Sequence, residues 1–163
     1  MSITRRNMKK IKLTQGKYVL VDDEDFAVLN KYKWHFHDKG AAVRKIYISA
    51  VKQRIVYMHR EIMKPMGNTE VDHINHDQLD NRKNNLRLCN RAENNANMRM
   101  SRHNSSSYKG VSYNKKEKKY RAYISIANKQ KHLGYFPTAI IAAKAYNEAA
   151  KRLRGVFAWI NPL

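Results

Sequence analysis

The feature that most constrains this chain is an Asp-His pair, Asp72-His73, at the end of a short apolar-led segment. A polar stretch rich in Asp and Asn follows it, and then comes a second short apolar segment over 86–89. Asn90, with Glu93 three residues later, carries the signature of a helix N-terminus with a capping box. This order predicts two strands, joined by a loop and followed by a helix. The second turn of that helix brings Asn94 back toward the Asp-His pair.

A carboxylate, an amide oxygen and an imidazole in one small volume suit metal-assisted attack on a phosphodiester. Oxygen donors such as Asp72 and Asn94 are those that Mg²⁺ prefers, and Mg²⁺ also keeps waters and takes oxygens from a substrate phosphate. The imidazole of His73 is near neutral at physiological pH and can take a proton from an attacking water.

These residues resemble the motif of the HNH endonucleases, whose active site is the ββα-metal site. The resemblance covers roughly 55–98, and its elements match in order and at the right separations. They are His59-Arg60, Asp72-His73, the run from Asp80-Asn81 to Asn85-Leu86-Arg87, and Asn94. Asn94 stands where many members have a final His, as in the H-N-N variant of the family.

The resemblance implies a role for each residue of the motif. His73 is expected to be the general base, and Asp72 and Asn94 to bind a single Mg²⁺ (or Mn²⁺) that polarises the phosphate and stabilises the leaving oxygen. Asn85 is expected to tie the two strands together through its amide. Hydrolysis is expected to leave 5′-phosphate and 3′-hydroxyl ends. The DNA contacts expected in this region are His59, Arg60, Arg87 and Arg91, against the plainer alternatives of a structural histidine and solvated arginines.

Short runs of alternating apolar and polar residues precede the motif. They predict a hairpin over 11–21 and a second strand pair over 41–48 and 53–58, with a half-buried strand near Trp34 and Phe36. Between them, the acidic run 22–25 predicts the start of a short helix. A metal cluster is the alternative for these acids, but no second ligand set follows them.

From residue 107 the pattern changes to that of three strands and one helix. Strands are expected over 108–113, 120–126 and 131–136, and a helix begins after Thr138 as N-cap and ends at Gly155. This segment resembles the AP2/ERF DNA-binding domain. The residues that carry the resemblance are Tyr108-Lys109-Gly110-Val111, Leu133-Gly134-Tyr135-Phe136, the helix segment 142–150, Leu153-Arg154-Gly155, and Ala158 with Asn161.

The resemblance implies that the sheet lies in the major groove of DNA with the helix behind it. The expected contacts are Lys109, Lys116, Lys119, Arg121 and Lys131. Where plant members present Arg and Trp to the bases, this chain has Ser112, Asn114, Gln130 and His132. Only the docking mode therefore carries over, and the recognised sequence does not.

The charge of the chain indicates its partner. Its formal net charge is +20, and the last 66 residues carry 14 Lys and Arg against 2 Asp and Glu. Such charge favours a polyanion, here double-stranded DNA. The lone cysteine, Cys89, is expected to be buried. No apolar segment suggests a leader or membrane span. We expect no membrane and no small-molecule cofactor, and a cytoplasmic, phage-encoded protein that acts in the host cell; monomer and weak dimer both stay open.

The predicted fold class is α+β, with N-terminal strands that lead into a ββα-metal HNH motif, then a three-stranded antiparallel sheet packed on one helix. The predicted domains are 1–97, with a nuclease core over 55–97, a linker over 98–106, and an AP2-like domain over 107–163. The expected function is a homing-type, metal-dependent DNA endonuclease. The alternatives are a non-catalytic DNA-binding regulator with a degenerate HNH scaffold, and a basic RNA-binding or ribosome-associated protein.

Overall fold

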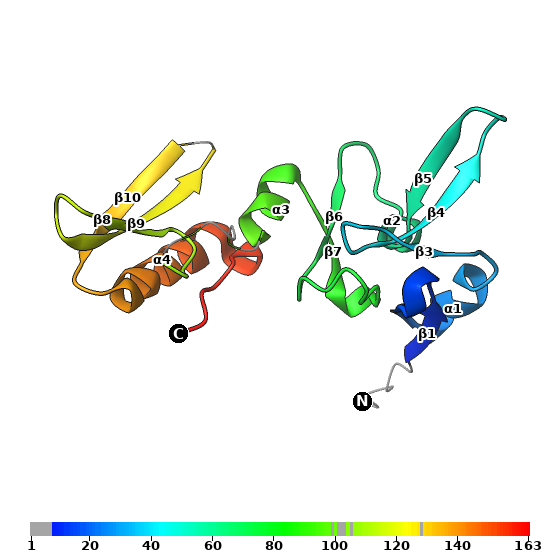
Figure 1. Cartoon of the computed structure of the whole chain (residues 1–163), viewed down its shortest axis with the longest axis horizontal. Coiled ribbons are helices and arrows are strands. Elements are labelled where there is room, and N and C mark those ends of the chain that lie inside the picture. Colours follow the sequence, from blue (N-terminus) through cyan, green and yellow to red (C-terminus); the bar gives the residue numbers. More distant parts are fainter. Residues whose placement is uncertain (1–7, 99, 101–103, 105, 128) are drawn as a thin grey trace. The chain divides into compact units, whose positions relative to one another are not determined.

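The computed structural model of the protein describes residues 8–98, 100, 104, 106–127 and 129–163 (Figure 1). Its internal contacts divide the chain into two compact units, Met1–Asn90 and Arg91–Leu163. Both units mix helices with small antiparallel sheets, which confirms the α+β class. Within the expected linker over 98–106, residues 99, 101–103 and 105 lie outside the described residues. No described helix is both long and apolar enough to cross a membrane.

The first unit consists of three small antiparallel sheets with short helices between them. Its sheets are β1–β2, β3–β4–β5 and β6–β7. In chain order its elements are β1 (Met8–Lys12), η1 (Thr14–Gly16), β2 (Tyr18–Asp22), α1 (Asp23–Leu29), β3 (His35–Phe36), β4 (Ala42–Tyr47), β5 (Gln53–Tyr57), α2 (Met58–Met63), β6 (Glu70–His73), η2 (Lys83–Asn85) and β7 (Leu86–Cys89). The two predicted strand pairs of the N-terminal region are confirmed, whereas the helix α2 was not predicted.

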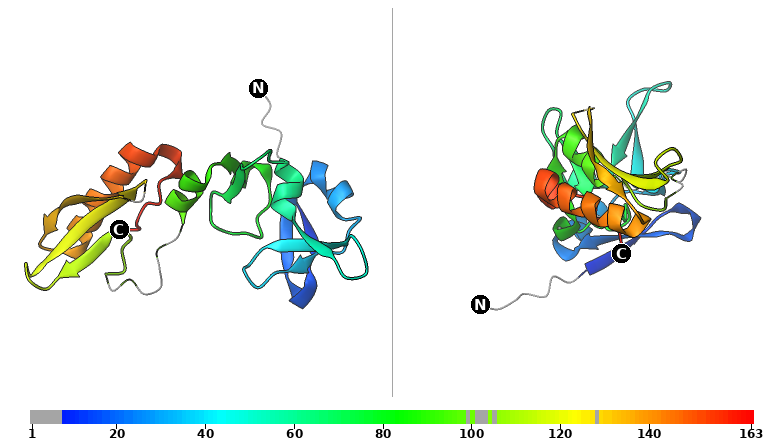
Figure 2. Two further views of the ribbon diagram at one scale, coloured as in Figure 1. Left: turned by 90° about the horizontal axis from the view of Figure 1, so that it is seen from above. Right: turned by 90° about the vertical axis from the view of Figure 1, so that its left-hand side faces the viewer.

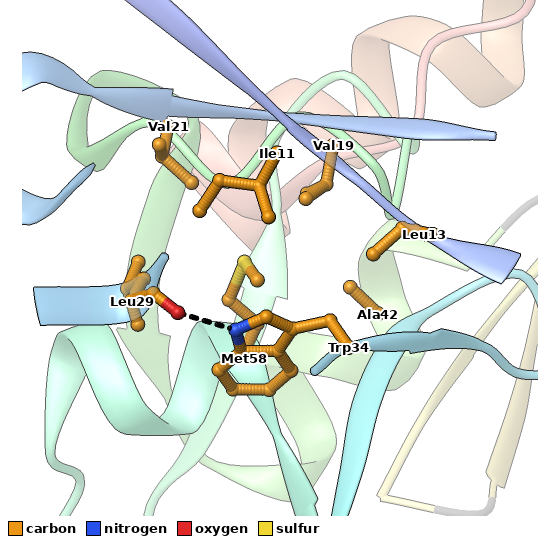
Figure 3. Packing of buried hydrophobic residues seen from close by; sticks show 8 residues of the cluster. All are labelled: Ile11, Leu13, Val19, Val21, Leu29, Trp34, Ala42 and Met58. Carbon is orange, nitrogen blue, oxygen red and sulfur yellow. Dashed lines mark hydrogen bonds between the residues drawn. The ribbon is translucent and has the colours of Figure 1, made fainter. Parts of the chain in front are cut away.

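The core of this unit surrounds Trp34, which is 1% exposed (Figure 3). Alternate residues of β1 and β2 turn toward it, because successive side chains of a strand point to opposite faces. The indole Nε1 of Trp34 donates a hydrogen bond to the carbonyl oxygen of Leu29 at 2.8 Å, which satisfies its polar atom in the core. The residues packed around it are Ile11, Leu13, Val19, Val21, Leu29, Ala42 and Met58. Only His35–Phe36 of the expected half-buried strand forms a strand, and Trp34 is fully buried beside it.

The loop between β6 and β7 is attached to the N-terminal hairpin. The backbone of Leu20 donates to Leu79 and accepts from Asn81, each at 2.8 Å. The backbone N–H of Lys83 donates to the carboxylate of Asp22 at 2.7 Å. The N-terminal strands therefore hold the loop that follows the Asp-His pair.

The second unit contains a short helix, a three-stranded antiparallel sheet and a long helix. The elements are α3 (Arg91–Asn97), β8 (Val111–Asn114), β9 (Lys119–Ile126), β10 (Lys129–Phe136), α4 (Ala139–Arg154) and η3 (Gly155–Phe157), and the sheet order is β10–β9–β8. Figure 2 shows α4 lying along one face of the sheet. The Thr138 hydroxyl accepts a hydrogen bond from the backbone N–H of Ile141 at 3.3 Å, as an N-cap residue does.

Small residues let α4 approach the sheet closely. Ala142, Ala143 and Ala150 of α4 are fully buried. Gly110, before β8, has φ of +73°, and a Cβ there would lie 2.1 Å from the Tyr146 ring. The close approach therefore requires glycine at this position.

Candidate active site

Asp72 and His73 form the carboxyl end of β6. In the register with β7, Asp72 lies opposite Arg87 and His73 opposite Leu86. Both residues are 7% exposed, which is unusual for polar residues at a strand end. β6 and β7 are strands on either side of the polar loop, where the sequence predicts two strands.

The carboxylate of Asp72 is held by Arg87 across the two strands. The Nε and Nη2 atoms of Arg87 donate to Oδ2 of Asp72, at 2.8 and 2.6 Å. Side-chain exposures of 14% and 8% leave this pair little screened by water. Hydrogen-bonded neighbours of this kind orient the carboxylates that ligate metals. Arg87, expected from the sequence to contact phosphate, thus lies where it fixes Asp72.

The surroundings of His73 favour its neutral form. Its Nε2 lies 3.4 Å from Oδ1 of Asn81, which is itself fully buried. Burial lowers the pKa of His73 below its ordinary value, and the hydrogen bond to Asn81 and the nearby carboxylates of Asp72, Asp77 and Asp80 offset only part of that shift. A neutral imidazole has a lone pair that can accept a proton.

His59 forms a wall of this site. Its ring lies edge to face against the ring of His73, with centroids 5.0 Å apart. Burial, followed by the charges of His73 and Arg60, lowers the pKa of His59 to about 3. A neutral, half-buried imidazole is poorly suited to bind phosphate through charge, so the contact with His73 is its clearest role. Arg60 next to it is exposed.

Sequence reasoning missed this contact because it missed α2, the helix that carries His59. A signal was present: Met58 and Ile62 are spaced as one face of a helix. In the structure Met58 is fully buried and Ile62 packs against the same core. The helix contacts both β6 and β7, which places His59 over the Asp-His pair.

Asn85 closes the loop between β6 and β7. Its Nδ2 donates to the carbonyl oxygen of Asp80 at 2.7 Å, and its Oδ1 accepts from the backbone N–H of Asn75 at 3.0 Å. The structure thus places its amide between the two arms of the loop, and the predicted tie between the two strands stays a prediction.

Two neighbouring residues, Asp80 and Asn81, also organise the loop, although no individual role was predicted for either. Arg82 donates to both carboxylate oxygens of Asp80, at 2.7 and 2.6 Å, and these hydrogen bonds lower the pKa of Asp80. The Nδ2 of Asn81 donates to the carbonyl oxygen of Gln78 at 3.1 Å, which turns Oδ1 of Asn81 toward His73. Polar turn formers in this spacing were the available signal.

The acidic side chains at the start of α1 form ion pairs with lysines of the same unit. Asp23 pairs with Lys9 at 2.7 Å, and Glu24 and Asp25 pair with Lys83 at 2.6 and 3.2 Å. Among the described residues, no group of three or more His, Cys, Asp or Glu side chains forms a metal-binding cluster. These contacts favour the helix start over the alternative of a metal cluster.

Arg91 and Asn94 lie on α3, in the second unit. Arg91 is exposed and Asn94 is half-buried. The expected convergence of Asn94 with Asp72 stays a prediction.

The face of the C-terminal sheet that points away from α4 carries polar and aromatic side chains. Strand alternation and register assign to this outer face Lys119, Arg121, Tyr123, His132 and Tyr135. Arg121 lies over the Tyr123 ring, 5.2 Å from its centroid, and donates to Gln130 at 3.2 Å. Lys116 is exposed in the turn before β9.

Two of the expected DNA contacts, Lys131 and Lys109, do not lie on this outer face of the sheet. Lys131 pairs with the buried Ile124, so its side chain leaves the sheet on the side of α4. The ammonium of Lys109 donates to the carbonyl oxygens of Ala96 and Met98, at 3.0 and 2.5 Å, and burial lowers its pKa to about 8. Lys109 therefore stabilises the end of α3.

Similarity to plant transcription factors covers about a third of the chain. An AP2-like ethylene-responsive transcription factor, TOE2, of Arabidopsis thaliana is 42% identical over 60 residues, which is 37% of this chain and 12% of that protein. APETALA2-like protein 2 of Oryza sativa subsp. japonica is also 42% identical over 60 residues, 14% of its length. No solved structure matches the chain.

Similarity to nucleases covers the Asp-His site and extends over most of the chain. A family model described as HNH endonuclease matches residues 52–96, which include the whole β6–β7 loop and the residues around it. An uncharacterized HNH endonuclease, L560, of Acanthamoeba polyphaga mimivirus is 30% identical over 149 residues, 91% of this chain and 77% of that protein. With these matches, and with the buried Asp72-His73 pair at the end of β6, the chain belongs to the HNH endonuclease family.

Proposed function

We propose that the protein is a metal-dependent DNA endonuclease that hydrolyses phosphodiester bonds, with its C-terminal sheet holding the duplex. The observation that carries the proposal is the site at the end of β6, where a carboxylate and a neutral imidazole are adjacent. A hydrolytic nuclease needs such a base to accept the proton of the attacking water.

His73 is proposed as the general base. Its lowered pKa keeps the imidazole neutral at physiological pH, and the buried Asn81 and the edge of the His59 ring fix its orientation. A positioned base contributes about 10²–10⁴-fold to the rate of such reactions.

Asp72 and Asn94 are proposed to bind one divalent ion, Mg²⁺ or Mn²⁺. Asp72 fits this task, because its carboxylate is little exposed and Arg87 already orients one of its oxygens. Two protein oxygens with water and substrate oxygens form a normal Mg²⁺ ligand set. When bound, the ion would polarise the scissile phosphate and neutralise the charge that develops on it.

The outer face of the C-terminal sheet is proposed to bind duplex DNA in the major groove, as the plant similarity supports. Lys119 and Arg121 are its proposed phosphate or base contacts, with Lys116 in the adjoining turn. A homing-type role and a phage or viral origin remain part of the proposal, and the viral HNH relative is in keeping with the origin only.

The proposal is tested by plasmid nicking with purified His73→Ala. With Mg²⁺ present, the variant should nick at least about 100-fold more slowly than wild type, because the base is gone. Its affinity for the same DNA without metal should stay within about twofold. Chelation with EDTA should stop the wild type, and Mg²⁺ or Mn²⁺ should restore it.

His132→Ala is the matched control, because it removes an imidazole from the outer face of the sheet. It should weaken DNA binding and leave the rate at saturating protein near that of wild type. Equal nicking by wild type and His73→Ala would show that another group is the base. Specific binding by the wild type without nicking in any metal would instead support the non-catalytic regulator.

A further inference from the structure

The sheet β3–β4–β5 has an open face that the nuclease site does not use. A groove of about 670 Å³ lies along it, between β4 and the segment that follows α1. This volume falls in the range of ligand-binding sites in proteins. We name it the N-terminal groove, and the side chains that matter for it are Tyr32, Lys33, Phe36, Lys45, Tyr47 and Ile55. Residues 8–51, which carry most of them, precede the part matched by the family model.

Register explains which side chains reach the groove. Lys45 and Tyr47 alternate with Arg44 and Ile46 along β4, and Ile55 of β5 lies opposite Lys45. β3 pairs with β4 only at Ala42 and Val43, so most of β4 has no strand on that side (Figure 1). The β4–β5 hairpin thus presents one open edge and one open face.

The groove combines exposed aromatic rings with cations. Tyr47 is 73% exposed and Tyr32 is 42% exposed. Both exposures are high for rings that bury well in cores. Lys33 and Lys45 lie among these rings, and Asp38 is the one acid of the lining. Stacking platforms interleaved with cations are the means by which proteins bind single-stranded nucleic acid.

Arg44 packs on the ring of Tyr32 at one side of the groove. Its guanidinium lies 4.1 Å from the centroid of the Tyr32 ring and pairs with Glu61 at 3.0 Å. The ring of Tyr32 is therefore ordered before any ligand arrives, which lowers the entropic cost of stacking on it. The charge of Arg44 is balanced by Glu61, so Lys33 and Lys45 remain as the cations that would meet phosphates.

The positive charge around the N-terminal groove indicates which class of ligand it would bind. Residues 30–57 contain seven Lys and Arg and one acid, Asp38, a balance of +6. This excess of positive charge would not attract an uncharged peptide or an apolar partner, whereas it attracts a polyanion. A duplex presents only base edges in its grooves, because its bases are stacked on one another. Exposed ring faces in a concavity instead suit unstacked bases.

We propose that the N-terminal groove binds single-stranded DNA, with bases stacked on Tyr47 and Tyr32 and phosphates held by Lys33 and Lys45. The site is separate from the Asp-His pair, and the inference does not depend on cleavage. In this proposal the β3–β4–β5 sheet binds an unpaired DNA strand.

The test uses the full chain and a fluorescein-labelled thymidine 12-mer in EDTA, which removes any effect of nuclease activity. Binding is followed by fluorescence anisotropy at fixed salt. Tyr47→Ala/Lys45→Ala should bind the oligonucleotide at least about tenfold more weakly than wild type, through the loss of one stacking platform and one phosphate contact. Its thermal melt should match that of wild type, because Tyr47 is largely exposed.

Tyr18→Ala/Lys10→Ala is the matched control. It removes an exposed tyrosine and an exposed lysine from the β1–β2 hairpin, outside the groove, and changes the net charge equally. This control should keep its affinity within about twofold, since general electrostatics change by the same amount in both variants. Equal losses in the two double variants would overturn the proposal.

Photocrosslinking locates the bound strand independently of affinity. A 12-mer with 5-iodouracil should crosslink to Tyr47 or Tyr32, read by mass spectrometry. Crosslinks confined to the second unit would overturn the proposal. So would a duplex of the same length that competes equally with the labelled strand, or a uridine 12-mer that binds more tightly than the thymidine one.

Discussion

The Asp72–Arg87 pair holds the carboxylate of the candidate site in place. Both partners are little exposed, and each carries a full charge that water cannot solvate well. Breaking such a pair by removing one partner leaves the other charge buried and uncompensated.

We expect Asp72→Asn to lower the free energy of unfolding by about 3 kcal/mol. Urea unfolding in EDTA measures this without interference from a metal. Glu148→Gln is the control, because Glu148 forms an ion pair with Lys151 in which both side chains are more than half exposed. Its effect should stay below about 0.5 kcal/mol. Equal effects of the two substitutions would show that the buried pair adds no stability.

His59 should make the protein less stable in mild acid. Its pKa is about 3 in the folded protein against 6.5 ordinarily, so the unfolded chain binds the extra proton in the window between these values. Stability from a neutral His59 is therefore fully present above pH 6.5 and is lost as the pH falls toward 3.

We expect the Tm of wild type to fall more steeply between pH 6.5 and 4 than that of His59→Phe, which cannot take up a proton. Differential scanning calorimetry across this range measures the two slopes. His37→Phe, at a histidine outside the Asp-His site, is the control for replacing an imidazole by a phenyl ring. Identical slopes for wild type and His59→Phe would mean that His59 titrates normally.

At the scale of elements, the packing of α4 on its sheet depends on the absence of a side chain at Gly110. A Cβ there would lie 2.1 Å from the Tyr146 ring and 2.5 Å from the carbonyl oxygen of Tyr123. Neither atom can move without separating the helix from the sheet.

Gly110→Ala should therefore lower the free energy of unfolding by more than about 3 kcal/mol, through overpacking together with a left-handed backbone. Gly67→Ala is the matched control: its φ is +55°, and no atom lies within 4 Å of the added Cβ. It should cost about 1 kcal/mol, from backbone conformation alone. Denaturant unfolding distinguishes the two, and a loss at Gly110 no larger than at Gly67 would refute the close packing.

Local patterns predicted most elements of this fold. Alternation was enough for the β1–β2 and β4–β5 hairpins, and an N-cap with a terminal glycine was enough for α4. The helix α2 has only six residues, too few for a periodic signal to exceed that of the strand before it.

The Asp-His pair of the candidate site could be picked out from the sequence, but its surroundings could not. The Asp-His pair is visible in the sequence, because its chemistry requires those residue types. The contact of His59 with His73 and the pairing of Asp72 with Arg87 arise from packing between segments distant in the chain. Lys109 was misleading for the same reason: its charge predicted a phosphate contact, while the fold directs it to backbone carbonyls.

At the scale of the whole molecule, a net charge of +20 makes affinity for DNA strongly dependent on salt. Each phosphate neutralised contributes a slope of about −0.9 to the logarithm of the association constant against the logarithm of salt concentration. The outer face of the C-terminal sheet should account for part of this slope.

We expect Lys119→Ala/Arg121→Ala to reduce the slope for duplex DNA by about 1.8, since both cations lie on the outer face. Lys131→Ala removes a cation from the side of the sheet that faces α4, and it should leave the slope nearly unchanged. Anisotropy titrations over a range of salt concentrations measure both. A larger effect of Lys131→Ala than of the double variant would reverse the assignment of the binding face.

The last turn of α3 has a consequence for how such proteins can be recombined. Helix α3 carries Asn94 of the nuclease motif, yet its final carbonyl groups are bound by Lys109 and by Arg154, at the end of α4. A gene fusion that exchanged everything after residue 98 for another domain would leave that turn without these cations. Such an exchange must therefore supply substitutes for both side chains, so α3 is inherited together with the sheet and helix that bind its end.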